Sequence, residues 1–550
     1  MSLLTRLTPL LLSLIPLAAA AQVPPTNAGR ELQEAQKPLQ QRPEAPALPT
    51  IQAPTPAPSP APAGGDARVT VTHFLFSGNT VFKTEELQEH LEEFTNRPLS
   101  FGELMQVVEK IEAYYHAAGY FLTQAYLPPQ QIRDGSIEIA LTEGRLGQVR
   151  IEGESRVDPD VIYGYLERLP KKAPLRLPVL ERQLMLATEL AGATTNLDLQ
   201  AGEEAGTSDV VLVLKPDATV LASASVNNHG MAATGVYRAS LNLIANSPAS
   251  LGDRLSANAM LSDTRDLTSY NLRYEVPLGA DGWRVSAAAT RAEYSLGSSF
   301  ASLNGSGVAN SVKLGASYPF IRSRATNLKA QVEADQAKMV DLLLGGRNDK
   351  RGHGLTFTLS ADWMDTYLGT GMNRAELAAK RGQIKLGELA PPGDVAGVHG
   401  WYAKTSLTLG RQQMLSPTWS MGLQWQEQWA QKNLDSSEKF SAGGPTTLPG
   451  YANGEGSADA GSLVKINLRW QYDPALALGI FSDYAHLRLL HMPVTAASNR
   501  RHLQDNGVTA DWTIMKGLSL NAILAFAGKE DAAGTDKRNR RLWVAANYAW

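Results

Sequence analysis

The chain from residue 217 to residue 550 alternates between apolar and polar residues, and this pattern limits the possible folds more than any other feature. Segments of about ten residues with apolar side chains at every second position are separated by turns rich in Gly, Asn, Asp and Ser. Tyr270 and Leu272, for example, lie on one face of such a segment, while Asn271 and Arg273 lie on the other. A period of two predicts β-strands with one apolar and one polar face.

A soluble sandwich and a membrane barrel both show this alternation. Aromatic residues at the strand ends, polar opposite faces and an export signal favour the barrel. After the first 21 residues no stretch of about 20 apolar residues appears, which excludes a bundle of membrane helices. In lipid only helices and closed barrels satisfy every backbone hydrogen bond. We therefore predict a transmembrane barrel over residues 217–550.

The length of this region sets the number of strands. At about 21 residues for a strand with its connection, residues 217–550 give about 16 antiparallel strands, and 14 or 18 remain possible. The last strand alternates up to Tyr548 and Trp550. Bacterial outer-membrane barrels end in this way, so we interpret these two aromatic residues as the terminal signal of the barrel.

The N-terminus predicts export. Residues 1–21 combine a short basic start, a leucine-rich apolar run and the sequence Ala-Ala-Ala, which is the layout of a secretory signal peptide. Residues 22–43 contain a polar segment, 27–41, that reads as a helix without an apolar face to join a core. Residues 44–67 are rich in Pro and Ala and predict an extended linker. The chain has no cysteine, which suits a Gram-negative envelope protein.

Between the linker and the barrel, two units repeat the order strand, helix, helix, strand, strand. They cover residues 68–143 and 144–216. In the first unit we expect helices over 84–94 and 100–118, the second of them started by a capping box of Ser100 and Glu103. Two units of similar length with one order predict a tandem α+β repeat.

Three segments resemble the two-partner secretion translocators, the TpsB family. They are Gly119–Gly153, Asn227–Leu255 and Gly443–Tyr451. The resemblance implies a plug helix, a linker, two periplasmic POTRA (polypeptide-transport-associated) domains and a 16-stranded barrel in the outer membrane. It also implies export of a partner related to the TpsA exoproteins, which include haemolysins, without ATP. Outer-membrane lipid and the barrel assembly machinery are further expected partners, and a monomer without cofactor is expected.

The resemblance also implies three sets of functional residues. The candidate surface for partner recognition is formed by Phe121, Leu122, Tyr126, Leu127 and Pro128. The tip of the loop that folds back into the lumen is Leu448, Pro449, Gly450 and Tyr451. The strand motif facing this loop is Gly479, Phe481 and Asp483.

One position departs from the family pattern. The family loop ends in Val-Arg-Gly-Tyr, and its arginine contacts an acidic residue on a barrel strand, whereas Pro449 stands at the arginine position here. We therefore expect Asp483 to accept a hydrogen bond from another donor or from water. We expect Tyr451 and the rigid Pro-Gly turn to hold the loop tip.

Other functions are disfavoured by composition and motif. The formal net charge of -3 argues against a nucleic-acid binder. The nine histidines are scattered without metal-ligand spacing, and no nucleophile elbow occurs, so we expect neither an enzyme nor a metal site. A general porin needs no periplasmic repeats, and a BamA-like insertase usually carries five POTRA domains. Both stay alternatives to the translocator.

Overall fold

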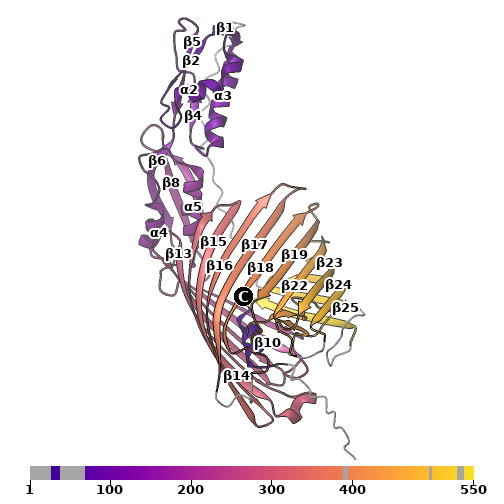
Figure 1. The fold of residues 1–550 in the computed structure, drawn as a ribbon. Helices are drawn as coiled ribbons and strands as arrows, with labels where there is room; N and C mark the ends of the chain where they lie inside the picture. Colours follow the sequence, from indigo (N-terminus) through magenta and orange to yellow (C-terminus); the bar gives the residue numbers. More distant parts are fainter. Residues whose placement is uncertain (1–25, 38–67, 388–393, 495–497, 529–537) are drawn as a thin grey trace, which may run out of the picture.

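The computed structural model describes residues 26–37, 68–387, 394–494, 498–528 and 538–550. Along the chain these residues form a short helix, two α+β units and a large barrel (Figure 1). The expected signal peptide (1–21) and linker (44–67) lie outside the described residues, as do residues 22–25 and 38–43 of the expected plug segment. Among the described helices, none combines the length and hydropathy needed to cross a membrane.

The barrel is closed by sixteen antiparallel strands, which confirms the strand number predicted from length. β26 pairs with β9 from Ala545↔Asn227 to Ala549↔Ser223 and completes the ring. In chain order the barrel strands are β9 (Val220–Asn227), β10 (Arg238–Asn246), β11 (Arg254–Ser262), β12 (Leu267–Leu278), β13 (Trp283–Ser295), β14 (Ser306–Arg322), β15 (Thr326–Leu343), β16 (Gly346–Asp365), β17 (Gly371–Leu386), β18 (Gly400–Met414), β19 (Trp419–Ala430), β22 (Ala460–Gln471), β23 (Leu476–Arg488), β24 (Arg500–Met515), β25 (Leu518–Ala527) and β26 (Arg540–Ala549).

The barrel wall varies in height. β14, β15 and β16 have 17, 18 and 20 residues, whereas β9 and β10 have 8 and 9. About 9 to 11 residues of a tilted strand span the hydrocarbon core of a bilayer. The long strands therefore extend well past the membrane core.

The predicted alternation sets the two faces of the barrel wall. Tyr270 and Leu272 are exposed on the outside, while Asn271 points to the lumen and donates a hydrogen bond of 2.7 Å to Thr290 Oγ1. Aromatic pairs at the strand ends include Tyr548 with Trp550, whose rings stack with centroids 5.7 Å apart. An apolar exterior around a polar interior is what a lipid-embedded barrel requires.

The first α+β unit has two small sheets against two helices. β2 (His73–Ser77), β5 (Ser136–Thr142) and β4 (Gln124–Tyr126) form one sheet in the order β2-β5-β4, and β1 (Arg68–Val71) pairs with β3 (Arg97–Ser100) in the other. α2 (Thr84–Glu89) and α3 (Phe101–Ala117) cover them.

Two details of this unit differ from the sequence prediction, and one confirms it. The helix expected over 84–94 ends at Glu89 and is followed by a separate 3₁₀ turn, η1 (Glu92–Phe94), because the chain must turn back into β3, a strand that was not predicted. The capping box is present, since Ser100 N donates to Glu103 Oε2 at 2.8 Å and Glu103 N donates to Ser100 Oγ at 3.3 Å.

The second unit has the predicted order of elements. β6 (Arg145–Gly153), α4 (Pro159–Leu166), α5 (Leu177–Thr188), β7 (Ala193–Ala201) and β8 (Thr207–Pro216) follow one another, and the strands pair in the order β6-β8-β7. α5 begins at Leu177 with Pro178 in its first turn, where proline is well tolerated.

The second unit docks directly on the barrel turns. Arg182 of α5 donates to the carbonyl oxygens of Pro319 at 2.8 Å and Asp281 at 3.1 Å. Glu189 forms ion pairs with Arg322 and Arg284, two residues of the barrel. These turns lie at the end of the barrel that carries the two units, and this is the end expected to face the periplasm (Figure 1).

Candidate functional site

The helix α1 (Ala28–Gln36) lies inside the barrel, against β12 to β15 (Figure 1). Asn27 caps it by accepting a hydrogen bond from Arg30 N at 3.1 Å, and Ala28 N donates to Asp341 Oδ1 on β15 at 2.7 Å. At the other end, Gln36 Nε2 donates to Ser311 Oγ on β14 at 2.6 Å. Both ends of the helix are thus held by polar side chains of the lumen.

The helix differs from the prediction in two ways. It ends at Gln36 rather than at residue 41. It also has a small apolar face, because Ala28 and Leu32 stand four residues apart and are both buried in a cluster that includes Tyr294 of the wall. Two residues are too few to reveal an amphipathic pattern in the sequence.

The inward loop, residues 431–459 between β19 and β22, folds back into the lumen. Its short hairpin pairs β20 (Phe440–Ala442) with β21 (Gly456–Ala458). Glu438 lies 2.8 Å from Lys380 Nζ and 3.0 Å from Lys404 Nζ, on two neighbouring wall strands. Asp435 lies 3.0 Å from Lys350 Nζ on a third strand. Three lysines of the wall therefore hold two carboxylates of the loop.

Burial and ion pairing shift the pKa of the Glu438 carboxyl in opposite directions. Burial favours its neutral form, but Lys404 and Lys380 outweigh burial and lower the pKa of Glu438 to about 2. The carboxylate is therefore ionised, and the loop anchor is formed, at every physiological pH.

The inward loop also touches the helix. Ser436 Oγ donates to Asn27 Oδ1 at 2.7 Å, and Gln33 Nε2 donates to Lys439 O at 2.8 Å. A Cβ at Gly29 would stand 2.5 Å from Ser436 Oγ, so only glycine fits this approach. Helix and loop form one polar assembly across the lumen.

The loop tip is held by the last strands of the barrel. Gly450 N donates to Asp505 Oδ2 at 2.6 Å, and Arg541 Nε donates to Gly450 O at 3.1 Å. Trp543 Nε1 donates to Pro449 O at 2.7 Å. Most contacts to the tip are thus to its backbone, which explains how a proline can occupy this position.

Leu448 and Tyr451 complete the tip. Leu448 is fully buried, and Tyr451 is 3 % exposed with its hydroxyl donating to Gln504 O at 3.0 Å. Residues that sequence reasoning missed are Asp505, Arg541 and Trp543, with the three lysines of the wall. Their lumen-facing positions follow from the alternation, but nothing in the sequence pairs them with the loop.

Asp483 lies beside one lysine of the wall, Lys465. It is 1 % exposed in the lumen wall, yet neither of its carboxylate oxygens has a hydrogen-bond partner among the described residues. Lys465 Nζ stands 3.9 Å away and donates instead to Thr446 O of the loop at 2.9 Å. A cation other than the family arginine therefore stands beside Asp483, while the short contact of this lysine goes to the loop backbone. A hydrogen bond from water to Asp483 stays a prediction.

The other residues of the strand motif also face the lumen. Gly479 and Phe481 share the face of β23 with Asp483. The Phe481 ring lies over Gly507 on β24, where a Cβ would stand 2.4 Å from a ring atom. The motif is thus a packed part of the wall beneath the loop.

The candidate recognition residues separate into two groups. Leu122 is buried and Phe121 is partly buried in the core of the second unit, so both join the two units. Leu127 packs on the core of the first unit, and Pro128 is half-buried. Tyr126 is 48 % exposed on β4, an edge strand of its sheet. Whether they bind a partner stays a prediction.

The described residues hold no group of three or more His, Asp or Glu side chains that could bind a metal ion. The arrangement instead offers a polar lumen, two internal elements that fill it and an exposed sheet edge in the first unit.

Comparison with known proteins assigns this architecture. Residues 206–490, more than half of the chain, match the model of the haemolysin secretion/activation protein family ShlB/FhaC/HecB. The chain belongs to this family. Residues 69–144 match the POTRA domain of ShlB type.

Curated relatives and solved structures agree. The chain is 23% identical over 434 residues to the heme/hemopexin transporter protein HuxB of Haemophilus influenzae, covering 76% of this chain and 75% of the relative. It is 25% identical over 217 residues to the outer membrane transporter CdiB of Escherichia coli, covering 38% and 36%. The structure of CdiB from Escherichia coli superposes with a TM-score of 0.71 at 18% identity, covering 90% and 93%. BamA from Haemophilus ducreyi gives 0.53 at 14% identity, covering 88% and 100%.

Family and fold together define the class of the protein. It is an outer-membrane β-barrel transporter of the two-partner secretion type, with POTRA domains in the periplasm. The family consists of transporters rather than enzymes.

Proposed function

We propose that this transporter exports one secreted exoprotein in an extended, unfolded form through the lumen, after α1 and the inward loop have moved aside. The observation that carries the proposal is the assembly of Asn27 with Ser436 and of Glu438 with Lys380 and Lys404 inside a closed barrel. The contacts of this assembly are polar, and α1 adds only Ala28 and Leu32 to the apolar cluster of the wall, so the helix can leave without exposing a large apolar core.

Recognition takes place at the first POTRA domain. β4 is an edge strand and leaves backbone groups free to pair with an added strand. Tyr126 on β4 is 48 % exposed and Phe101 at the start of α3 is 44 % exposed, which provides apolar contacts for the incoming chain. An unfolded exoprotein would extend this sheet before it enters the lumen.

Transport needs no nucleotide in this proposal. The exoprotein folds outside the cell, and a chain that has folded there cannot slide back, so folding draws the equilibrium outward. The protein acts as a monomer, since one chain closes a complete barrel. Its assembly in the outer membrane depends on outer-membrane lipid and the barrel assembly machinery.

The first exoprotein to test is one that handles haem. The relatives matched over three quarters of their length are heme/hemopexin transporter proteins. Haemolysins and the exoproteins exported by CdiB-like transporters are the next candidates, because those relatives match over a smaller part of the chain.

The deciding experiment measures export of the exoprotein from the neighbouring reading frame in cells that carry the full-length transporter. Deletion of residues 68–143 is expected to abolish export while the barrel still assembles, as shown by slower migration after boiling in a detergent gel. Surviving export would move recognition away from the first POTRA domain. Loss of many other outer-membrane proteins would favour an insertase, and conductance that is unaffected by any exoprotein would favour a porin.

A further inference from the structure

The outer face of β13 to β17 carries an unusual row of cations. Arg291, Lys338, Arg351 and Lys385 are exposed, and each stands within five residues of the extracellular end of its strand. Cross-strand pairing puts them in register through Asn310, as Arg291↔Asn310, Asn310↔Lys338, Lys338↔Arg351 and Arg351↔Lys385. We call these four residues the cationic row.

Three members of the row repel one another. Lys338, Arg351 and Lys385 are direct neighbours on adjacent strands, and like charges in this position destabilise a sheet. None of the three has a carboxylate within 4.0 Å among the described residues. The nearby carboxylate of Asp349 is paired with Arg347 at 2.8 Å, and that of Glu293 is paired with Arg291. The row therefore has an excess of positive charge.

The row marks a change in the outer surface. Towards the periplasm, the outer face becomes apolar within a few positions. Val312 follows Asn310 directly, whereas the exposed apolar residues Leu355, Phe357 and Leu377 lie beyond a belt of polar and charged outward residues, Gln336, His353, Arg381 and Gln383. β15 and β16 have 18 and 20 residues, more than the 9 to 11 that cross the hydrocarbon core. The cationic row thus stands where the hydrocarbon ends and the headgroups of the outer leaflet begin.

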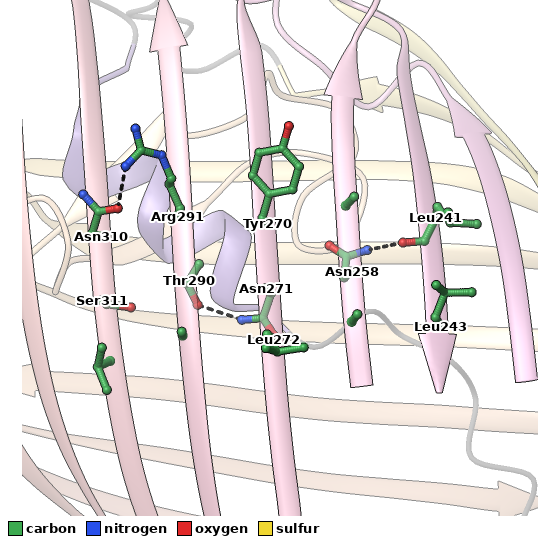
Figure 2. Close-up of a pocket in the computed structure, with 14 residues that line it drawn as sticks. Leu241, Leu243, Asn258, Tyr270, Asn271, Leu272, Thr290, Arg291, Asn310 and Ser311 are labelled. Atoms are coloured by element: carbon green, nitrogen blue, oxygen red, sulfur yellow. Dashed lines mark hydrogen bonds between the residues drawn. The ribbon is translucent and has the colours of Figure 1, made fainter. Parts of the chain in front are cut away.

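A hollow in the same outer face adjoins the row (Figure 2). It has a volume of about 530 Å³, within the range of ligand sites. Its floor consists of small residues, Ala257, Ala259 and Ala289, between the larger side chains of Leu241, Leu272 and Val312. Arg291 and Asn310 stand at its edge, joined by a hydrogen bond of 3.1 Å.

We propose that this face binds a phosphorylated glycolipid of the outer leaflet, with its phosphate groups on the cationic row and an acyl chain in the hollow. Phosphate matches the row because Arg and Lys form short, charge-assisted hydrogen bonds with it, which removes the repulsion among Lys338, Arg351 and Lys385. The alanine floor leaves room for an acyl chain beside the anchored headgroup.

The test uses the purified full-length transporter in neutral detergent, titrated with bisphosphorylated lipid A and read by native mass spectrometry. The wild type is expected to retain one lipid A, and Lys338→Gln with Arg351→Gln is expected to weaken binding at least about tenfold. The matched control, Arg500→Gln with Arg540→Gln, removes two exposed arginines at extracellular strand ends on another side of the barrel and should change binding less than twofold.

Two further arms test the headgroup and the hollow separately. Ala289→Leu fills the hollow without changing charge and is expected to weaken binding severalfold. Phosphatidylcholine, which lacks net charge, is expected not to be retained. Every variant is first checked for a folded barrel by its heat-dependent gel migration. Equal binding by the wild type and the Lys338/Arg351 variant, or equal retention of phosphatidylcholine, would overturn the proposal.

Discussion

Ser436 of the inward loop donates a hydrogen bond of 2.7 Å to the Asn27 side chain, the same oxygen that caps the lumen helix. One side chain therefore stabilises the helix and joins it to the loop. Movement of the loop removes a partner of the cap, so the two elements that fill the lumen are expected to leave together.

Weakening this contact should open the lumen. Asn27→Ala removes the cap, which costs about 1 kcal/mol of helix stability, and also removes the bond to Ser436. Gly29→Val adds a clash with the same loop. Both variants are expected to raise the open time in planar-bilayer recordings, as is deletion of residues 22–43. Lys37→Ala, at an exposed position beyond the helix, is the control. If Asn27→Ala, Gly29→Val and the deletion all left the recordings unchanged, the helix would not act as a plug.

The loop anchor should resist acid. A carboxyl whose pKa is lowered in the folded protein contributes stability above its unfolded pKa and loses it as pH falls through the folded value. For Glu438 this window runs from 4.5 down to about 2. Conductance is therefore expected to stay the same between pH 7 and pH 5. Glu438→Gln should open the channel at pH 7, and a wild-type channel that opened already at pH 6 would contradict this anchor.

Substitutions at the loop tip should affect secretion according to the space around each residue. A Cβ at Gly450 would stand 2.7 Å from Asp505 Cβ and 3.0 Å from the Ala527 backbone, so Gly450→Val should displace the tip and impair secretion. Tyr451→Ala should impair it as well, by leaving a cavity beside Leu448. Pro449→Arg is expected to be tolerated, because the contact at this residue is to its carbonyl oxygen. The measurement is exoprotein in the culture medium, normalised to transporter in the outer membrane. Normal secretion by both damaging variants would show that the loop has no part in transport.

The exposed edge strand of the first POTRA domain should contribute to the affinity for the unfolded exoprotein. Tyr126→Ala removes the exposed aromatic side chain of the edge strand and Phe101→Ala that at the start of α3, and together they should weaken capture of the unfolded exoprotein at least about tenfold, as loss of aromatic contacts commonly does. Ile132→Ser alters another exposed apolar side chain of the same domain, outside β4 and α3, and serves as the control. A larger effect of the control would place recognition elsewhere.

Patterns along the chain predicted the parts of the fold that repeat. Sixteen strands follow from alternation and length, and the capping box at Ser100 follows from two residues. β3 was missed because its four residues include Pro98 and show no alternation. The partners of the loop tip could not be predicted, since Asp505 and Trp543 meet Pro449 and Gly450 only after the barrel has closed. The sequence shows that Pro449 stands where the family has an arginine. It does not show that contacts to the loop backbone hold the tip in place of the arginine's ion pair.

The docking of the second POTRA domain has a mechanical consequence. Arg182 and Glu189 contact the ends of β13 and β14 and the turn between β12 and β13 through hydrogen bonds and ion pairs. A pull on this domain is therefore transmitted straight to the barrel rim instead of swinging the domain aside. We expect the domain to keep one orientation to the barrel, so that an exported polypeptide would meet the same entrance throughout its passage.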